Sequence, residues 1–264
     1  MPFENEEDVL QRYLRSYRPI MEGKIAWERL NDYPRLSEEF CAVLDYIEGA
    51  EIHVHEDARF VRASPVYRLP VIRKFVDAWE WDEAKHAEIL ARAREYLGLP
   101  ALCQQTPSRF SLLGEKMVLV AAEVAPEIFL KLYLLIASTH ELITRYTYTH
   151  FGDLCGNPVL AGIFSAIAEQ ESRHFVFYYR TAELLLNQSP RGRGVIRWKL
   201  GQYALVGEAV QGTEAASRVI RALTFDPEGR RLASLVDQTM QKLPGLEGLP
   251  IFVGRVEKAF AAFS

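Results

Sequence analysis

Residues 79–90 read WEWDEAKHAEIL, and within this stretch Glu83 and His86 are three residues apart in a segment whose apolar residues recur at helical spacing. On an α-helix, residues three apart differ by about 60° around the axis, so both side chains project from one face and can reach one metal ion. The chain is rich in glutamate, however, and a single Glu-x-x-His pair does not distinguish a metal-binding face from ordinary helix surface.

A second copy of this pattern lies further along the chain. Residues 70–86, PVIRKFVDAWEWDEAKH, match residues 158–174, PVLAGIFSAIAEQESRH, because proline opens both segments and Glu-x-x-His closes both. Each copy follows a segment with an interior glutamate, Glu51 before the first and Glu141 before the second. The sequence therefore predicts two similar helix pairs, which is the arrangement that builds a four-helix bundle.

Apolar residues recur with the helical period along most of the chain, and alternating strand patterns are nearly absent. We expect an all-α protein with a single domain over residues 1–264, a core bundle over about 37–187 and additional helices at both ends. Prolines are expected to open helices at Pro70, Pro158 and Pro227 and to bend one at Pro126. The predicted helices cover residues 6–17, 22–31, 37–61, 70–97, 110–150, 158–187, 195–223, 227–242 and 248–262.

Composition makes several classes of function less favoured without excluding them. A net charge of −4 and a pI of about 5.9 do not favour binding to nucleic acid or to an anionic membrane surface. The three cysteines, Cys41, Cys103 and Cys155, are widely spaced, which argues against a disulfide framework or a structural zinc site. No leader pattern opens the chain, and its most apolar run is interrupted by Lys131, so we expect a cytoplasmic protein without a membrane span.

The repeat collects the residue types that hold a pair of metal ions. Bundles with di-iron or di-manganese carboxylate centres use one Glu from each of two helices and a Glu-x-x-His from each of the other two. Carboxylate and imidazole ligands suit redox-active iron, with manganese as an alternative, and open coordination positions admit dioxygen. The competing interpretation is a set of solvated helix faces, which is weakened by the apolar residues that surround the later copy. The predicted ligands are Glu51, Glu83, His86, Glu141, Glu171 and His174.

The first-helix ligand is open to an alternative, because Glu48 competes with Glu51, although Glu51 fits the repeat better. His53 and His55 are also close enough in sequence to bind metal, but surface histidines are the more ordinary reading. His140 precedes Glu141 and points about 100° away from it, so we expect it to support or pack beside the site rather than ligate.

At these motifs, AWEWDEAKH, AEQESRH and the ELIT that contains Glu141, the sequence resembles the soluble acyl-carrier-protein desaturases of the ferritin-like superfamily, including their short bacterial members. The resemblance covers roughly residues 37–190 and implies that the six residues are iron ligands. Thr144 matches the family threonine beside the oxygen-binding side of the cluster, and Trp79 matches a tryptophan near the route of electron entry. An interior helix threonine and a core tryptophan remain the alternative explanations for these two residues.

Gln170 departs from the family pattern, which has aspartate immediately before the second Glu-x-x-His. That aspartate accepts a hydrogen bond from the first ligand histidine, and such partners tune metal binding and electron transfer. Glutamine can accept the same bond without carrying charge. Asp82, which precedes the first motif, is expected to be the equivalent partner of His174.

The resemblance implies a dioxygen-dependent oxidoreductase that desaturates a fatty acyl chain carried on acyl carrier protein, with electrons from a ferredoxin-like donor and a homodimeric assembly. A basic cluster is a candidate surface for the acidic carrier, with a solvated loop as the alternative: Arg191, Arg193, Arg197 and Lys199. Apolar residues that could line a substrate tunnel, with an ordinary hydrophobic core as the alternative, are Phe129, Tyr133, Ile136, Phe164 and Ile167.

Two other functions stay open. One is a di-iron hydroxylase or N-oxygenase acting on a small or carrier-bound substrate, although Ile167 stands where arylamine-oxidising relatives have an extra histidine. The other is a non-catalytic ferritin-like protein for iron handling, against which the length of the chain and its C-terminal helices argue.

Overall fold

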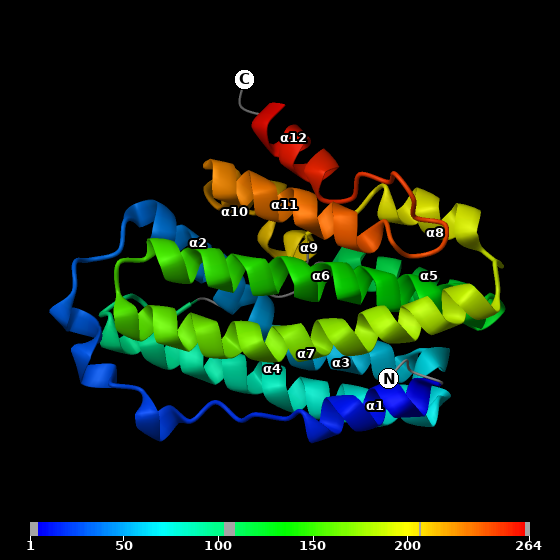
Figure 1. Ribbon diagram of the computed structural model, residues 1–264, viewed down its shortest axis with the longest axis horizontal. Helices are drawn as coiled ribbons and strands as arrows, with labels where there is room; N and C mark the ends of the chain where they lie inside the picture. Colours follow the sequence, from blue (N-terminus) through cyan, green and yellow to red (C-terminus); the bar gives the residue numbers. More distant parts are fainter. Residues whose placement is uncertain (1–4, 103–108, 206, 262–264) are drawn as a thin grey trace.

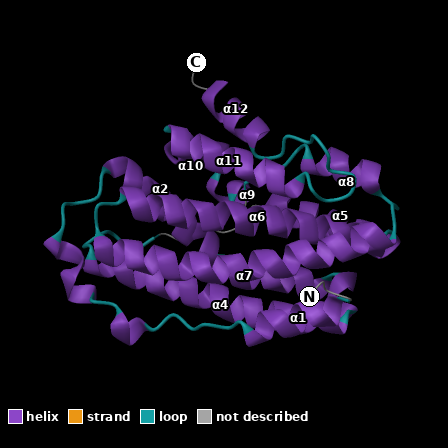
Figure 2. Ribbon diagram, in the orientation of Figure 1, coloured by secondary structure: helices purple, strands orange, loops and turns teal. Residues whose placement is uncertain are grey.

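The computed structural model describes residues 5–102, 109–205 and 207–261, and these residues form helices and loops without a strand (Figure 1, Figure 2). This confirms the all-α prediction. The α-helices are α1 (Glu6–Arg15), α2 (Glu38–Ile52), α3 (Val54–Ala63), α4 (Pro70–Tyr96), α5 (Arg109–Val124), α6 (Pro126–Leu154), α7 (Pro158–Gln188), α8 (Arg193–Leu200), α9 (Glu208–Gln211), α10 (Thr213–Thr224), α11 (Pro227–Met240) and α12 (Val253–Ala261). Short 3₁₀ helices cover Glu22–Lys24 (η1), Trp27–Asp32 (η2) and Pro65–Arg68 (η3).

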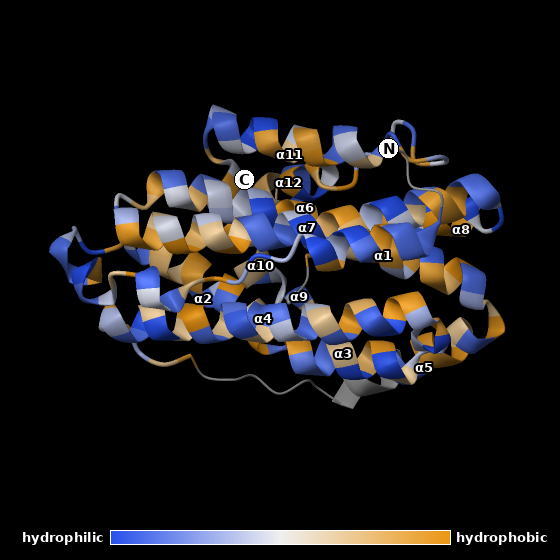
Figure 3. Cartoon of the chain, turned by 60° about the horizontal axis from the view of Figure 1, so that its bottom comes forward, coloured by the Kyte–Doolittle hydropathy of each residue, from blue (hydrophilic) through white to orange (hydrophobic). Residues whose placement is uncertain are grey.

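Four helical columns form the body of the molecule: α2 followed by α3, then α4, α6 and α7. Helix α6 packs along α7, and α4 packs against α2, α3 and α7 (Figure 1). Hydrophobic and hydrophilic bands alternate along the long helices in Figure 3, as expected for helices with one buried and one exposed side. The two repeat copies therefore end up as neighbouring long helices, α4 and α7.

Prolines open the long helices where the sequence predicts them. Pro70 and Pro158 are the first residues of α4 and α7, and Pro227 is the first residue of α11. The Asn157 side chain accepts hydrogen bonds from the backbone N–H groups of Val159 and Leu160, which caps α7. Proline suits this position because its missing N–H would have no partner within the helix.

Several predicted helices are divided in the structure, and others begin later or are 3₁₀ turns. The helix expected over 37–61 is interrupted at His53, and the one expected over 110–150 is two helices, because Pro126 starts a new helix instead of bending an existing one. Residues 22–31 form 3₁₀ turns, and the last helix begins only at Val253. The segment 195–223 is divided into α8, α9 and α10: α8 already ends at Leu200, and Gly207 and Gly212, with positive φ angles of 84° and 90°, flank the short α9.

The C-terminal helices form a layer over one side of the four columns. Helix α10 packs against α2 and α12, α11 packs against α6, and all lie above α6 in the view of Figure 1. Helix α1 packs on the other side, against α7 and α4. This C-terminal layer supplies one wall of the cavity described below.

Within the described ranges, none of the helices combines the length and the apolar character that a membrane crossing requires. Cys41 and Cys155 are free thiols, and Cys103 lies outside the described residues.

Candidate metal centre and adjoining cavity

The six predicted ligands meet in the interior, one set from each column. Helix α2 supplies Glu51, α4 supplies Glu83 and His86, α6 supplies Glu141, and α7 supplies Glu171 and His174. All six are buried, and both imidazoles are fully inaccessible to solvent. Residues far apart in the sequence are therefore brought together at the level where the four columns face one another.

Their donor atoms fall into two overlapping groups. Glu51, Glu83, His86 and Glu171 form the first, and Glu83, Glu141, Glu171 and His174 form the second, with the ligand atoms of each group within 4.8 Å of one another. Because Glu83 and Glu171 belong to both groups, they lie between two adjacent positions for metal ions. Glu51 belongs to the first position alone and Glu141 to the second alone.

Each imidazole directs its Nδ1 atom at its own group. His86 Nδ1 lies 3.3 Å from a carboxylate oxygen of Glu83 and 3.3 Å from one of Glu171. His174 Nδ1 lies 2.9 Å from Glu83, 3.4 Å from Glu171 and 3.7 Å from Glu141. A metal ion in either position would therefore have one imidazole nitrogen and several carboxylate oxygens as ligands.

The opposite ring nitrogens are held by two different side chains. His86 Nε2 lies 2.7 Å from the amide oxygen of Gln170, and His174 Nε2 lies 3.3 Å from Oδ2 of Asp82. Both acceptors favour the tautomer with hydrogen on Nε2, which leaves the Nδ1 lone pair directed at the carboxylates. Asp82 is thus located where the sequence predicts the partner of His174.

The cluster fits divalent cations because its own polar atoms are not satisfied. Glu83 Oε1, His86 Nδ1 and Glu171 Oε1 are buried and have no hydrogen-bond partner. Among the described residues, no lysine or arginine forms an ion pair with the four carboxylates. Buried carboxylates without compensating charge are costly, and two divalent ions with oxygen and imidazole ligands would supply that charge.

Burial and mutual repulsion shift the titration of these carboxyl groups. Burial raises the pKa of Glu51 to about 8, and the negative charge of Glu83 adds to this effect. Burial, followed by repulsion from Glu83 and Glu141, also raises the pKa of Glu171 well above its usual value. Without metal the cluster therefore retains protons, which bound cations would displace.

The pKa values of the two ligand histidines are also raised. Burial alone would lower the pKa of His86, but the carboxylates of Glu171, Glu51 and Glu83, which surround its Nδ1 atom, raise it well above its ordinary value. For Glu83, burial favours the neutral acid, yet the two imidazoles lower its pKa well below its usual range. Glu83 is thus the carboxylate that stays ionised while the groups around it hold protons.

The competing candidates for metal binding lie elsewhere. Glu48 is buried but pairs with Arg94, whose Nε lies 2.5 Å from the carboxylate. His53 and His55 lie 2.8 Å from the carboxylates of Glu56 and Glu80. The structure brings Glu51 into the cluster and leaves Glu48, His53 and His55 outside it.

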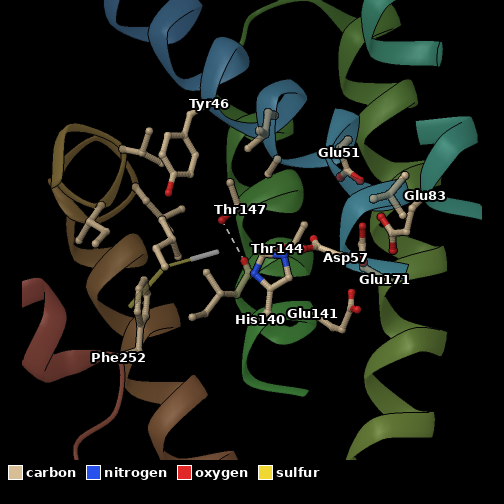
Figure 4. A pocket seen from close by; sticks show the side chains of 18 of the residues that line it. Tyr46, Glu51, Asp57, Glu83, His140, Glu141, Thr144, Thr147, Glu171 and Phe252 are labelled. Atoms are coloured by element: carbon tan, nitrogen blue, oxygen red, sulfur yellow. Dashed lines mark hydrogen bonds between the residues drawn. The ribbon is translucent and has the colours of Figure 1, made fainter. Parts of the chain in front are cut away.

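A cavity of about 70 Å³ adjoins the cluster and opens onto both metal positions (Figure 4). Ligand carboxylates of Glu51, Glu83, Glu141 and Glu171 form one end of its wall. The remaining wall is mainly apolar, with the carboxylate of Asp57 as a further charged group, and comes from α2, α3, α4, α6 and the C-terminal layer. Apolar and aromatic residues of this wall are Tyr46, Ile47, Ala50, Val54, Ile143, Leu205, Val219, Ile220, Leu223 and Phe252.

Thr144 and Trp79 both line this cavity, together with His140 and Thr147. The Thr144 hydroxyl lies 3.5 Å from His140 Nε2. Trp79 Nε1 and His140 Nδ1 are buried in the cavity wall without a hydrogen-bond partner. The two residues singled out in the sequence therefore lie within reach of a molecule in the cavity.

None of the five apolar residues named from the sequence for a substrate tunnel lines this cavity. Phe164 and Ile167 are fully buried in the core, and Ile136 is 37% exposed. The actual wall depends on α10 and the loop before α12, which no motif of the core bundle identifies. Their only signal in the sequence is the helical spacing of Val219, Ile220 and Leu223, which indicates a buried face without saying what it covers.

The basic cluster is partly engaged in holding α8. Arg193 donates to the carbonyl oxygen of Leu186, and Arg197 donates to the carbonyl oxygens of Gly245 and Glu247. Arg191 is exposed, with Glu127 at 3.9 Å, and Lys199 lies over the ring of Trp198. The cluster therefore offers less free positive charge than its sequence suggests.

Comparison with known proteins does not assign the chain to a family. Neither the scan against protein-family models nor the search of curated proteins gave a match.

Proposed function

We propose that this protein is a di-iron oxidoreductase that uses dioxygen to oxidise an organic substrate held in the adjoining cavity. The observation that carries the proposal is the burial of four carboxylates and two imidazoles, with no lysine or arginine partner among the described residues, at the end of a mainly apolar cavity. Manganese would satisfy the same donor set and is the alternative metal.

Iron bound by these residues would supply the redox chemistry with dioxygen. The chain contributes the geometry: Glu83 and Glu171 reach both positions, while Gln170 and Asp82 fix the orientation of the two imidazoles. The apolar wall keeps competing water away from the reacting carbon. The Thr144 hydroxyl, at the metal end of that wall, can donate a hydrogen bond or hold a proton at its Oγ1 atom.

The resemblance of the two repeat motifs to acyl-carrier-protein desaturases makes desaturation of a carrier-bound fatty acyl chain the first candidate reaction. Electrons would then come from a ferredoxin-like donor. Arg191 and Lys199, beside the exposed ring of Trp198, are the part of the basic cluster that remains to meet an acidic carrier.

Cavity size favours a second candidate, which is hydroxylation or N-oxygenation of a small substrate. A volume of about 70 Å³ is well below the roughly 300–1,000 Å³ of pockets that hold drug-sized ligands. A long acyl chain would therefore require the α10 wall to move, whereas a compact molecule needs a smaller change. Unpaired nitrogen atoms of Trp79 and His140 on the wall would suit a substrate with a polar group.

Mass spectrometry of reaction products separates the candidates. Iron-loaded protein would be incubated with reductant, dioxygen and a panel of carrier-bound acyl chains and small aromatic or aliphatic molecules. Loss of two mass units indicates desaturation, and a gain of sixteen indicates oxygen insertion. If loaded protein consumed dioxygen and accumulated ferric iron without changing any substrate, the iron-handling alternative would replace both oxidoreductase readings.

A further inference from the structure

The two ligand imidazoles have unlike partners. Gln170 donates from Nε2 to the carbonyl oxygen of Arg18 at 2.8 Å, which turns its Oε1 atom toward His86. His86 therefore donates its Nε2 hydrogen to a neutral amide. An amide withdraws little of this hydrogen's positive charge, so it adds little to the basicity of Nδ1.

His174 instead donates to the carboxylate of Asp82, which has two further polar contacts. The hydroxyl of Tyr13 donates to Asp82 at 3.1 Å, and Arg173 Nη1 lies 3.6 Å from the same oxygen. Both contacts hold the carboxylate of Asp82 in place beside His174. A charged partner of this kind raises the basicity of a ligand imidazole and strengthens its bond to a metal ion.

Glu51 and Glu141 each belong to one position only, and the contacts of Glu51 also weaken the first position relative to the second. The buried hydroxyl of Tyr148 donates to Oε1 of Glu51 at 2.6 Å, so part of the charge of Glu51 is committed to the phenol. Glu83 and Glu171 belong to both groups and do not discriminate between the two positions. His86 and Glu51 therefore donate less electron density to a bound metal ion than His174 and Glu141 do, for two independent reasons.

We propose that the two metal positions of this chain are unequal, and that the position formed by His174 and Glu141 binds a divalent cation about 10–100-fold more tightly than the position formed by His86 and Glu51. The two positions then fill in order, and a protein with one ion per chain holds it beside His174. This inference rests on the proposed metal centre, and it adds the identity of the residues that set the order, Asp82 and Gln170.

The test is a titration of the metal-free full-length protein with Mn²⁺, in which electron paramagnetic resonance measures the free ion. Wild-type protein is expected to show two steps separated by about 10–100-fold in affinity, with the spectrum of a coupled ion pair appearing only during the second step. Asp82→Asn is expected to weaken the first step about 10–100-fold and bring the two steps together. Gln170→Glu, which gives His86 a charged partner, is expected to tighten the second step.

Glu48→Gln is the matched control, because it also replaces a buried carboxylate by an amide, close to Glu51 but outside the cluster. It is expected to leave both steps unchanged, and circular dichroism would verify that each variant is folded. The inference is overturned if wild-type protein binds two ions in indistinguishable steps, or if Asp82→Asn and Glu48→Gln have the same effect. Failure of the proposed function looks different, since the wild-type protein would then not bind two ions at all.

Discussion

At the scale of single residues, the cluster is organised by unbalanced charge. Four buried carboxylates have two imidazoles as their nearest positive partners, and buried oxygen atoms of Glu83 and Glu171 lack any hydrogen bond. Such an arrangement is unfavourable in a purely structural role, because each unpaired buried charge costs several kcal/mol or forces the group to bind a proton. Protons and metal ions are thus alternative occupants of one site.

This competition predicts a pH dependence for the metal-free protein. The pKa of Glu51 is raised from its usual 4.5 to about 8 in the folded chain, and those of Glu171, His86 and His174 are also raised. The folded state therefore binds more protons than the unfolded chain, and this stabilisation is full below about pH 4.5 and is lost as the pH rises through about 8. Glu83, whose pKa is lowered, acts oppositely only in the acid range.

Urea unfolding of metal-free protein between about pH 5 and about pH 9 measures this effect, and the midpoint is expected to fall as the pH rises. Saturation with a divalent metal should reduce the dependence, because the ions replace the protons. A midpoint that rose with pH in the metal-free protein would contradict the assigned directions.

The sequence predicts the six cluster residues because helical spacing and the repeat determine them together. A Glu and a His three residues apart must share a face, and matching places in two helix pairs must meet when the pairs pack. Neither helical spacing nor the repeat predicts which residues form the cavity wall. Val219 and Phe252 reach it through the path of the C-terminal layer, which depends on packing between segments distant in sequence.

At the scale of secondary-structure elements, the long helices α4, α6 and α7 set the level at which the ligands meet. Proline starts each of them, so their register is fixed from the N-terminal end. Helix α7 has an additional device in Asn157, whose Oδ1 accepts from two backbone N–H groups while its Nδ2 donates to the carbonyl oxygen of Leu30. This one side chain links the start of α7 to η2.

Replacing Asn157 tests this link. Asn157→Ala is expected to lower the free energy of unfolding by about 1–2 kcal/mol, because a helix cap and a buried hydrogen bond are lost together. Asn157→Ser keeps a neutral capping oxygen and loses only the bond to Leu30, so its effect should be smaller. Urea unfolding measures both values, and equal losses in the two variants would show that capping is not the main contribution.

Element boundaries were predictable where local chemistry dictates them. Pro70, Pro158 and the Asp226 cap before Pro227 all start helices as the sequence indicates. The break at His53 carries no glycine or proline, and the helices on either side of it, α2 and α3, both pack on α4. At Pro126 the sequence allows either a kink or a new start, and tertiary packing selects the start.

At the scale of the whole molecule, the C-terminal layer closes the cavity that the four columns leave beside the cluster. Helix α10 packs on α2 and contributes Val219, Ile220 and Leu223 to the wall. A four-helix core without this layer would leave this cavity, and the ligand carboxylates that line it, open on that side. The additional helices therefore shape the space available to a substrate.

Ile220→Ala tests this role of the layer. The residue is 1% exposed, so its truncation should reduce the free energy of unfolding by about 2–5 kcal/mol and enlarge the cavity. We expect the loaded variant to accept larger substrates than the wild-type protein in the product assay. Ile196→Ala is the control, because Ile196 is equally buried on α8 but does not line the cavity. If both variants changed the range of substrates alike, destabilisation rather than cavity size would be responsible.

The most direct measurement is the iron content of the protein after anaerobic addition of Fe²⁺ and removal of unbound metal, followed by exposure to dioxygen. The wild-type chain is predicted to retain two iron ions and to develop a visible absorption band with dioxygen. Glu171→Ala should abolish loading because Glu171 reaches both positions, whereas Glu169→Ala, an exposed change on the same helix, should not. Retention of less than one iron per chain by the wild-type protein, with no absorption change in dioxygen, would contradict the account.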